Sequence, residues 1–129
     1  MQSFSVYQTK QFARFARRAR LTDDDLLQSA QRANEGLIDV DLGGGVIKQR
    51  IARTGEGKSG GSRTILLFRQ GDRAVFVDGF EKKDQANISL SDLQKYRALA
   101  KYVFALSEVA WNESVRTGVF IEIGSLTED

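Results

Sequence analysis

Histidine and cysteine are both absent from this chain of 129 residues. Without cysteine the protein can have no disulfide, no thiol nucleophile and no thiolate metal site. Without histidine it also lacks the commonest general base near pH 7 and the commonest metal ligand. These absences exclude a Ser-His-Asp hydrolase, a zinc enzyme with imidazole ligands and a histidine-based ribonuclease. Any catalysis must come from Lys, Arg, Asp, Glu, Tyr, Ser or Thr side chains.

Long apolar runs are also missing, since no stretch approaches the roughly 18 residues that a membrane-spanning helix needs. The N-terminal residues do not show the charged region followed by an apolar region that marks a secretory signal. The composition, 41% hydrophobic and 28% charged, is typical of a soluble globular protein of one-domain size. We therefore expect a single domain over residues 1–129 that acts in the cytoplasm and not at a membrane.

Positive charge is concentrated in the middle of the chain, although the net charge is only +2. Two acidic residues in the segment 46–73, Glu56 and Asp72, face a larger set of basic ones. The basic residues of this segment are Lys48, Arg50, Arg53, Lys58, Arg63, Arg69 and Arg73. Such an uneven distribution says more about possible partners than the total charge does.

The hydrophobic pattern before residue 43 is mainly helical. Apolar residues at helical spacing predict one helix over 9–20 and a second over about 22–35. Thr22, with Asp25 three residues later, predicts the N-cap of the second helix. A short strand over residues 3–7 is expected before the first helix.

After residue 43 the pattern changes to short segments rich in β-branched and aromatic residues, which predict three consecutive antiparallel strands. These strands are expected over residues 46–53, 63–69 and 73–80. Helical spacing returns over 90–105, with a break near Ser107, and a final short strand over 119–124 precedes a frayed tail. We therefore expect an α+β fold with two N-terminal helices on one side of a central antiparallel sheet, and with the C-terminal helix at another edge or face.

The first strand of this meander alternates in polarity. Alternation places Lys48 and Arg50 on one face of the strand and Ile47, Gln49 and Ile51 on the other. Such a strand suits a sheet with one buried side. The basic pair is therefore expected to point to the same side of the sheet.

Residues 52–59, ARTGEGKS, approximate a phosphate-binding loop, with Gly57, Lys58 and Ser59 at the matching positions. Such a loop must open a helix, because the helix N-terminus forms part of the anion site. Here Ser59 is followed by a predicted strand. We therefore expect a hairpin loop over 54–62 that carries Lys58 and is mobile until a substrate binds, and we do not expect ATP binding.

Three motifs follow one another across the basic middle: KQRIA, GEGKSGGSR and GFEKKDQAN. With the order of helices and strands, they resemble the RelE/ParE superfamily of toxins from bacterial toxin–antitoxin systems, and within it the HigB-like branch. The resemblance covers roughly residues 40 to 90. It implies a RelE-like fold for the whole chain.

The resemblance also implies a function. RelE-type toxins are usually mRNA interferases, that is, endoribonucleases that cut messenger RNA and inhibit translation, and the ribosome is expected to be required. The ribose 2′-hydroxyl attacks the adjacent phosphate, and no metal or cofactor takes part. The implied partners are a cognate antitoxin, messenger RNA and the ribosome, with operator DNA reached through the antitoxin.

The family's functional residues can be carried over by motif position. The implied catalytic residues are Lys48, Arg50, Arg63 and Lys82. The implied RNA- or phosphate-binding residues are Arg53, Lys58, Arg69 and Lys83. Two features depart from the family pattern: Ser62 stands where an aromatic residue is common, and no tyrosine follows GFEKK. The acid that protonates the leaving group is therefore unassigned.

Independently of the family, this reaction needs a base near the 2′-hydroxyl, hydrogen-bond donors on the phosphate oxygens and an acid at the 5′-oxygen. A lysine becomes a base only where neighbouring cations disfavour its charged form, and an arginine can hold a phosphate through two parallel hydrogen bonds. Two other functions remain open: a non-enzymatic toxin that binds a protein target such as DNA gyrase, and an inactive remnant that only binds its antitoxin or DNA. Basic residues on a solvated strand face also serve solubility alone.

The remaining basic and aromatic residues have simpler explanations. The arginines of the first helix, such as Arg17, are expected to be solvated or to contact a partner protein rather than to catalyse. The aromatic residues at helical spacing are expected to lie in the core rather than to stack on bases. These aromatic residues are Phe12, Phe15, Tyr96 and Trp111.

Overall fold

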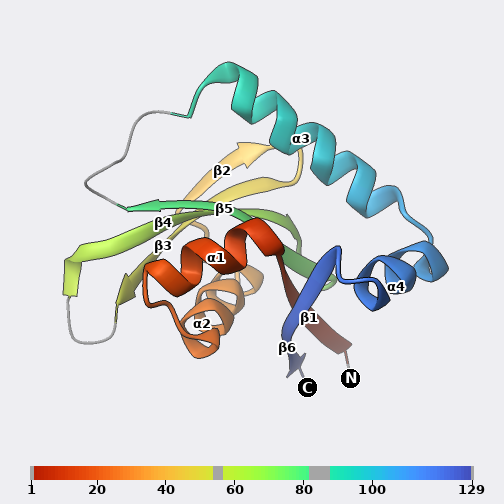
Figure 1. Cartoon of the computed structure of the whole chain (residues 1–129), viewed down its shortest axis with the longest axis horizontal. Coiled ribbons are helices and arrows are strands. Elements are labelled where there is room, and N and C mark those ends of the chain that lie inside the picture. The colour runs from red at the N-terminus through yellow and green to blue at the C-terminus, as the bar shows by residue number, and fades with distance from the viewer. Residues whose placement is uncertain (1, 54–56, 82–87, 129) are drawn as a thin grey trace.

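The computed structural model describes residues 2–53, 57–81 and 88–128 of the chain (Figure 1). Its helices are α1 (Lys10–Arg18), α2 (Asp23–Asn34), α3 (Leu90–Ala105) and α4 (Glu108–Arg116). Its strands are β1 (Gln2–Thr9), β2 (Val40–Gly43), β3 (Val46–Arg53), β4 (Gly57–Arg69), β5 (Arg73–Glu81) and β6 (Phe120–Glu128). Within these ranges, no helix combines the length and the apolar character that crossing a membrane requires.

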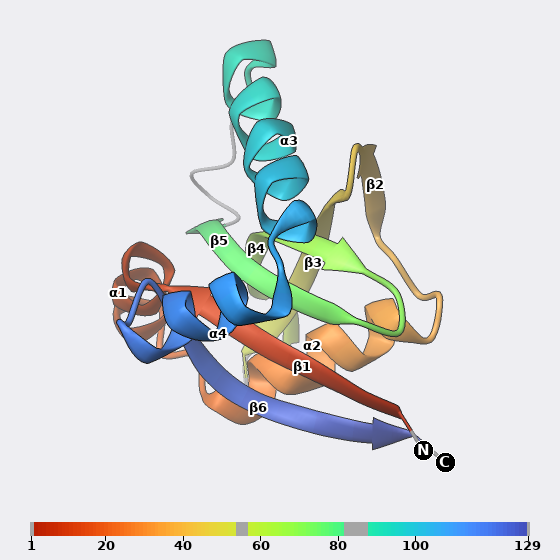
Figure 2. The ribbon, with the colours of Figure 1, turned by 90° about the vertical axis from the view of Figure 1, so that its right-hand side faces the viewer.

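The described strands form one sheet in the order β2-β3-β4-β5-β1-β6. Neighbouring strands are antiparallel except for β1 and β5, which run parallel. The N-terminal strand therefore lies between the end of the meander and the C-terminal strand, and the two chain termini lie side by side (Figure 2). The predicted α+β fold with its antiparallel meander β3–β4–β5 is confirmed, and the structure adds one parallel pair.

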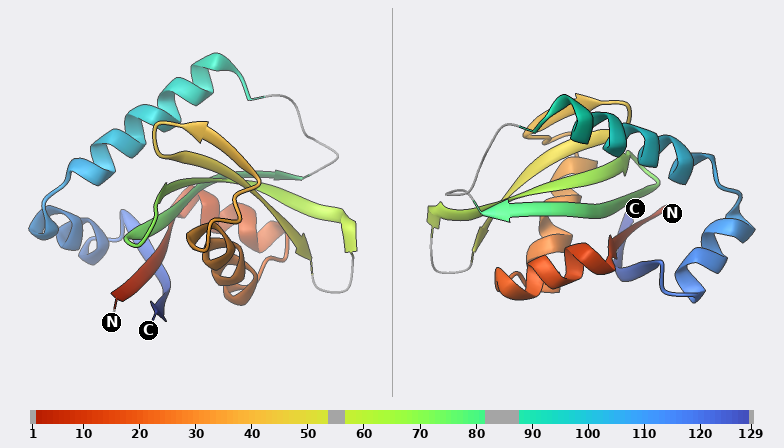
Figure 3. Two further views of the ribbon diagram at one scale, coloured as in Figure 1. Left: turned by 180° about the vertical axis from the view of Figure 1, so that it is seen from behind. Right: turned by 45° about the horizontal axis from the view of Figure 1, so that its top comes forward.

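The sheet is covered on both faces (Figures 1 and 3). On one face, α1 and α2 pack over a core in which the ring of Phe12 stacks on that of Phe76, with 4.9 Å between ring centroids. On the other face, α3 and α4 enclose a second core, where Trp111 stacks on Phe120 at 4.8 Å. The predicted placement of the N-terminal helices on one side and of the helix over 90–105 on another face is confirmed.

The helix boundaries follow local capping. At the start of α2, Thr22 Oγ1 accepts a hydrogen bond from Asp25 N (3.1 Å) and Asp25 Oδ2 accepts one from Thr22 N (2.9 Å). This reciprocal pair is the predicted capping box. Ser107 Oγ accepts from Ala110 N (3.1 Å) and so begins α4, which confirms the predicted break at that serine.

Two strand predictions were wrong. The edge strand β2 was not predicted, because it is only four residues long and lies beside a turn of consecutive glycines, Gly43 to Gly45, which all have positive φ. The expected frayed tail after residue 124 is instead part of β6. Pairing with β1 as far as Gln2 and Glu128 gives this segment backbone partners that the sequence alone does not reveal.

The glycine-rich segment after β3 also differs from expectation. The strand β4 begins at Gly57, so the predicted loop over 54–62 is wrong from residue 57 onward. Pairing with β3 overrides the low strand propensity of glycine here. Residues 54–56, the rest of that predicted mobile loop, lie outside the described residues. Because Ser59 lies within a strand and opens no helix, the exclusion of a phosphate-binding loop is confirmed.

Gly79 on β5 is required by the close approach of α1. A Cβ atom added there would lie 2.4 Å from Cε2 of Phe15, well inside any real contact. We therefore expect Gly79→Ala to lower the free energy of unfolding by about 1–3 kcal/mol, the usual cost of overpacking, as measured by urea denaturation. The double variant Gly79→Ala, Phe15→Leu should lose less stability than the sum of the losses in the two single variants. The reason is that leucine at position 15 leaves room for the new methyl group. Strictly additive costs would contradict this explanation.

Candidate functional site

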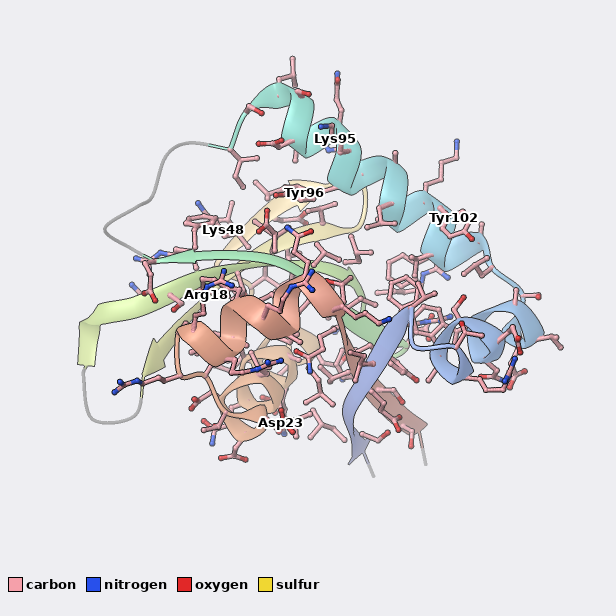
Figure 4. All side chains as sticks on the ribbon, viewed as in Figure 1. Arg18, Asp23, Lys48, Lys95, Tyr96 and Tyr102 are labelled. Atoms are coloured by element: carbon pink, nitrogen blue, oxygen red, sulfur yellow. The ribbon has the colours of Figure 1, made fainter. Side chains whose placement is uncertain are left out.

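Three basic side chains come together where β3 and β4 pair. In this register Arg50 lies directly opposite Arg63, and Lys48 lies opposite Ile65. Directly opposite residues of an antiparallel pair share one face, with Cβ atoms about 4.5–5.5 Å apart. Lys48, Arg50 and Arg63 therefore project from the face that α3 covers, and Figure 4 shows Lys48 on that side of the sheet. We call these three residues the basic cluster.

The opposite face of β3 is buried, as the alternation predicts. Ile47 is 2%, Gln49 0% and Ile51 4% exposed, whereas Lys48 is half-buried and Arg50 is exposed. The predicted division of this strand into a polar and a buried face is therefore confirmed. It fixes the direction in which the basic cluster points.

The basic cluster lines a hollow of about 320 Å³. Its lining residues are Asp39, Val40, Lys48, Arg50 and Arg63. Three cations face one carboxylate in this hollow, so the local charge is positive. A hollow of this size and charge suits an anionic group such as a phosphate.

Arg63 carries the clearest sign that this hollow takes an anion. Its Nη1 atom is shielded from solvent and has no hydrogen-bond partner among the described residues. A buried donor without an acceptor is costly, and like charges directly opposite each other, as in the Arg50–Arg63 pair, are destabilising. A phosphate in the hollow would supply the missing acceptor and reduce the repulsion between the two guanidinium groups.

Asp39 belongs to the site but was not predicted. Its Oδ2 accepts a hydrogen bond from the backbone N–H of Arg50 (2.6 Å) and lies 3.7 Å from Nη2 of Arg32. The same Arg32 nitrogen donates to the backbone carbonyl of Arg50 (2.9 Å). Asp39 and Arg32 thus bind the N–H and the carbonyl group of Arg50 and fix its backbone. No sequence signal pointed to Asp39, because it lies next to the unpredicted strand β2.

Gln49 connects the buried face of β3 to the residues that form the site. Its Oε1 accepts from the backbone N–H of Asp39 (2.7 Å), and its Nε2 donates to the carbonyls of Ser29 (3.2 Å) and Leu37 (3.3 Å). The Gln49 side chain is fully buried, the bond to Ser29 is buried as well, and the other two bonds are partly buried. Gln49 therefore holds Asp39, and the segment that leads into β2, beside the basic cluster.

A second polar pair lies on the same face of the sheet. The hydroxyl of Tyr96 on α3 donates to Oδ2 of Asp78, and Gly79 N donates to Oδ1 of the same carboxylate (2.8 Å). Asp78 lies opposite Ile65, so two strand spacings, about 10 Å, separate it from Lys48. Burial, followed by the hydrogen bond to Asp78 and its charge, raises the pKa of Tyr96 above its ordinary value. The phenol therefore stays protonated.

The predicted core aromatics are confirmed in their packing. Phe12 and Trp111 are buried, and Phe15 and Tyr96 are half-buried against the two cores. The contact between Tyr96 and Asp78 was missed, because it depends on where α3 crosses the sheet. An aspartate in the middle of the apolar run RAVFVDGF was the available signal, since a carboxylate in such a strand needs a polar partner.

Arg69 does not join the basic cluster. It lies at the other end of β4, opposite Arg73, with Nη1 3.9 Å from Oδ2 of Asp72. Its guanidinium lies over the ring of Phe104, 4.7 Å from the centroid. The predicted RNA contact of Arg69 would therefore belong to a different part of the surface.

The other predicted site residues lie wholly or partly outside the described part of the chain. Arg53 and Lys58 have backbones in β3 and β4, but their side chains are not described. Lys82 and Lys83 lie outside the described residues. Their predicted roles stay predictions.

The chain matches a known protein family. The family described as the RelE toxin of the RelE/RelB toxin–antitoxin system matches residues 4–123. The matched region begins in β1, ends in β6 and contains every helix and strand between them. No curated protein is similar enough to the chain to count as a match.

Proposed function

Because the chain belongs to the RelE toxin family and is therefore the toxin of a toxin–antitoxin system, we propose that it inhibits translation as a metal-independent endoribonuclease that cuts messenger RNA on the ribosome. Toxins of this family are generally endoribonucleases of this kind, and the family implies a cognate antitoxin as partner. The single observation that best supports the proposal is the basic cluster with its unpartnered, shielded Arg63 Nη1.

The basic cluster supplies the phosphate donors and the base that this reaction needs, whereas the acid at the 5′-oxygen is not assigned. Arg63 and Arg50 donate to the non-bridging oxygens of the phosphate that is cut, where negative charge grows in the transition state. Lys48 receives the proton of the 2′-hydroxyl or, if it stays charged, stabilises the attacking oxygen. A bond forms between the 2′-oxygen and phosphorus, and the bond between phosphorus and the 5′-oxygen breaks. The 5′-oxygen takes up a proton, and the products are a 2′,3′-cyclic phosphate and a 5′-hydroxyl.

Three finer parts of the proposal depend on the motifs. The motifs KQRIA, GEGKSGGSR and GFEKKDQAN favour the HigB-like branch of the family. Lys82, in the third motif, is proposed as a further catalytic cation, and Lys83, Arg53 and Lys58 as contacts to the RNA backbone. We propose that the protein acts in the cytoplasm, where message and ribosome meet, and that it reaches operator DNA through its antitoxin.

The chemistry of the cut ends tests this proposal. Purified toxin is incubated with ribosomes that carry a defined message, and the fragments are treated with enzymes specific for each kind of end. We expect 2′,3′-cyclic phosphate and 5′-hydroxyl ends, because the nucleophile is the neighbouring ribose hydroxyl. Fragments with 5′-phosphate and 3′-hydroxyl ends would require attack by water and would contradict the proposed reaction. If ribosome-bound message is not cut while free RNA is, the proposed requirement for the ribosome is wrong.

A further inference from the structure

A second hollow, of about 630 Å³, lies on the surface between the β2–β3 turn, the end of β4 and the second half of α3. Its floor and rim include Phe68, Arg69, Arg97, Ala100, Lys101 and Phe104. This hollow shares no lining residue with the hollow at the basic cluster, and its Arg69 lies six residues, about 20 Å, along β4 from Arg63. It is therefore distinct from the proposed catalytic site, and we call it the α3 hollow.

The α3 hollow has a cationic rim. Arg69, Arg97 and Lys101 line it, and none of the acidic residues in the described part of the chain does. Asp72 contacts the rim, but its carboxylate is shared: Oδ2 lies 3.9 Å from Nη1 of Arg69, and Oδ1 lies 3.3 Å from Nε of Arg73. Arg97 and Lys101 are four residues apart and so face the same way on α3. The rim thus carries more positive charge than its neighbours neutralise.

The wall of the α3 hollow is held in place before any partner binds. Arg97 donates to the carbonyl of Leu42 through Nε (3.1 Å) and also through Nη2. Its stem packs on the glycine turn so closely that a Cβ atom on Gly44 would lie 2.9 Å from Arg97 Cγ. Because the helix and the turn are fixed to each other, little conformational entropy is lost when a ligand enters.

The floor of the α3 hollow is apolar. Ala100 is fully buried, and Phe104 is half-buried in the same core beneath α3. The face of Phe104 is already engaged by the guanidinium of Arg69, 4.7 Å from the ring centroid. The hollow therefore offers no free aromatic platform for a nucleotide base, the feature on which single-stranded RNA binding depends. Cations above an apolar floor suit instead a peptide that presents carboxylates beside an apolar side chain.

From these observations we propose that the α3 hollow is the docking site for an acidic, amphipathic segment of the cognate antitoxin. Carboxylates of that segment pair with Lys101, Arg97 and Arg69, and an apolar side chain rests on the accessible part of Phe104. The proposal rests on the assignment to a toxin–antitoxin system. It predicts that antitoxin binding and RNA cleavage can be changed separately, because the two hollows are lined by different residues.

Charge reversal on the exposed edge of α3 tests this proposal. Lys101 and Ala105 both line the α3 hollow and are exposed, so glutamate at either position should leave the fold intact. We expect Lys101→Glu to weaken binding about tenfold and the double variant Lys101→Glu, Ala105→Glu to weaken it about a hundredfold. The probe is the purified product of the open reading frame next to the toxin gene, with binding measured by calorimetry at two salt concentrations. Wild-type affinity should fall as salt rises.

Lys95→Glu is the matched control. Lys95 is an exposed lysine of the same helix, it does not line the hollow, and Figure 4 shows it on the side of α3 away from the sheet. Its reversal changes the net charge by the same amount and should alter antitoxin affinity by less than about twofold. A thermal melt of each variant checks the fold. If Lys101→Glu unfolds, Lys101→Ala replaces it, with an expected loss of about threefold to tenfold.

The outcomes separate the possible occupants of the hollow. Unchanged antitoxin affinity in the double variant would overturn the proposal. Unchanged affinity together with slower cutting of ribosome-bound message would assign the hollow to RNA instead. A third outcome is that the wild-type protein does not cut RNA but the charge-reversal variants lose antitoxin affinity. This outcome would support the docking site and contradict the proposed nuclease function.

Discussion

Arg63→Gln is expected to slow the cutting of ribosome-bound message by about 10²- to 10³-fold, because a preorganised donor to the developing anion is typically worth about 2.7–4 kcal/mol of barrier. Expression of Arg63→Gln should therefore no longer arrest cell growth. The loss should occur without unfolding of the protein, since Arg63 lies on the half-exposed face of β4 and makes no hydrogen bond there through Nη1 among the described residues.

The stability of this variant is itself informative. Arg63 lies opposite Arg50, and like charges in directly opposite positions cost about 0.2–1 kcal/mol. Removing the charge of Arg63 removes that repulsion and a buried donor without an acceptor. The free energy of unfolding, measured by urea denaturation, should therefore stay the same or rise. Unchanged or higher stability on substitution is typical of a residue that serves ligand binding rather than folding.

Two further variants assign the roles within the basic cluster. Arg63→Lys keeps the charge but loses the planar fork, so its cutting rate should lie between those of wild type and Arg63→Gln. Arg17→Ala is the control, because Arg17 is an exposed residue of α1, on the opposite side of the sheet. It should keep most of the activity. An Arg63→Gln variant with more than half of the wild-type rate, or one whose activity falls only because the fold is lost, would contradict the proposed role.

Gln49→Ala is expected to lower the free energy of unfolding by about 3 kcal/mol or more. The substitution removes hydrogen bonds to Asp39 N, Ser29 O and Leu37 O and leaves a cavity in a fully buried position. Each buried backbone group that loses its partner costs about 1–3 kcal/mol. Because Gln49 also holds Asp39 beside Arg50, cutting of RNA should fall further than the folded fraction does.

Gln28→Ala is the matched control for this prediction. Gln28 is an exposed glutamine of α2 whose amide donates to Asp24 Oδ2 (3.1 Å) in contact with water. Its loss should change stability by less than about 0.5 kcal/mol. Urea denaturation of both variants gives the comparison. A free energy of unfolding of Gln49→Ala within about 1 kcal/mol of the wild-type value would be no larger a loss than that of a single solvated hydrogen bond. Such a result would contradict the proposed role of Gln49 in holding the site together.

The local features of this fold and site could be predicted from the sequence. The period of two in β3 assigned Lys48 and Arg50 to the polar face, and Thr22 with Asp25 marked the start of α2. Both signals depend on neighbours in the chain. The α+β class followed from the change of period near residue 43.

The remaining features depend on contacts between segments far apart in the sequence. The position of Arg63 opposite Arg50 is set by the register of β3 and β4, which a glycine-rich segment specifies only weakly. Pairing of the two chain ends converts the expected tail into β6. The contact of Tyr96 with Asp78 requires the crossing of α3 over the sheet.

The basic segment of the sequence divides into two surfaces for a simple geometric reason. The strand β4 is 13 residues long, so Arg63 and Arg69 point to the same side but lie about 20 Å apart. A charge count along the chain cannot show this separation. In the structure, Lys48, Arg50 and Arg63 line the proposed catalytic site, whereas Arg69 joins two cations of α3 at the rim of the α3 hollow.

The most direct test of the account compares wild-type protein with the double variant Lys48→Ala, Arg63→Ala in a purified translation system. Primer extension on the ribosome-bound message gives the position and rate of cutting, and calorimetry gives antitoxin affinity. The account predicts that wild type cuts the message, whereas the double variant binds the antitoxin as tightly as wild type but does not cut. Full cutting or full toxicity of the double variant, or no cutting of ribosome-bound message by wild type, would contradict it and would favour a toxin that acts by binding a protein target.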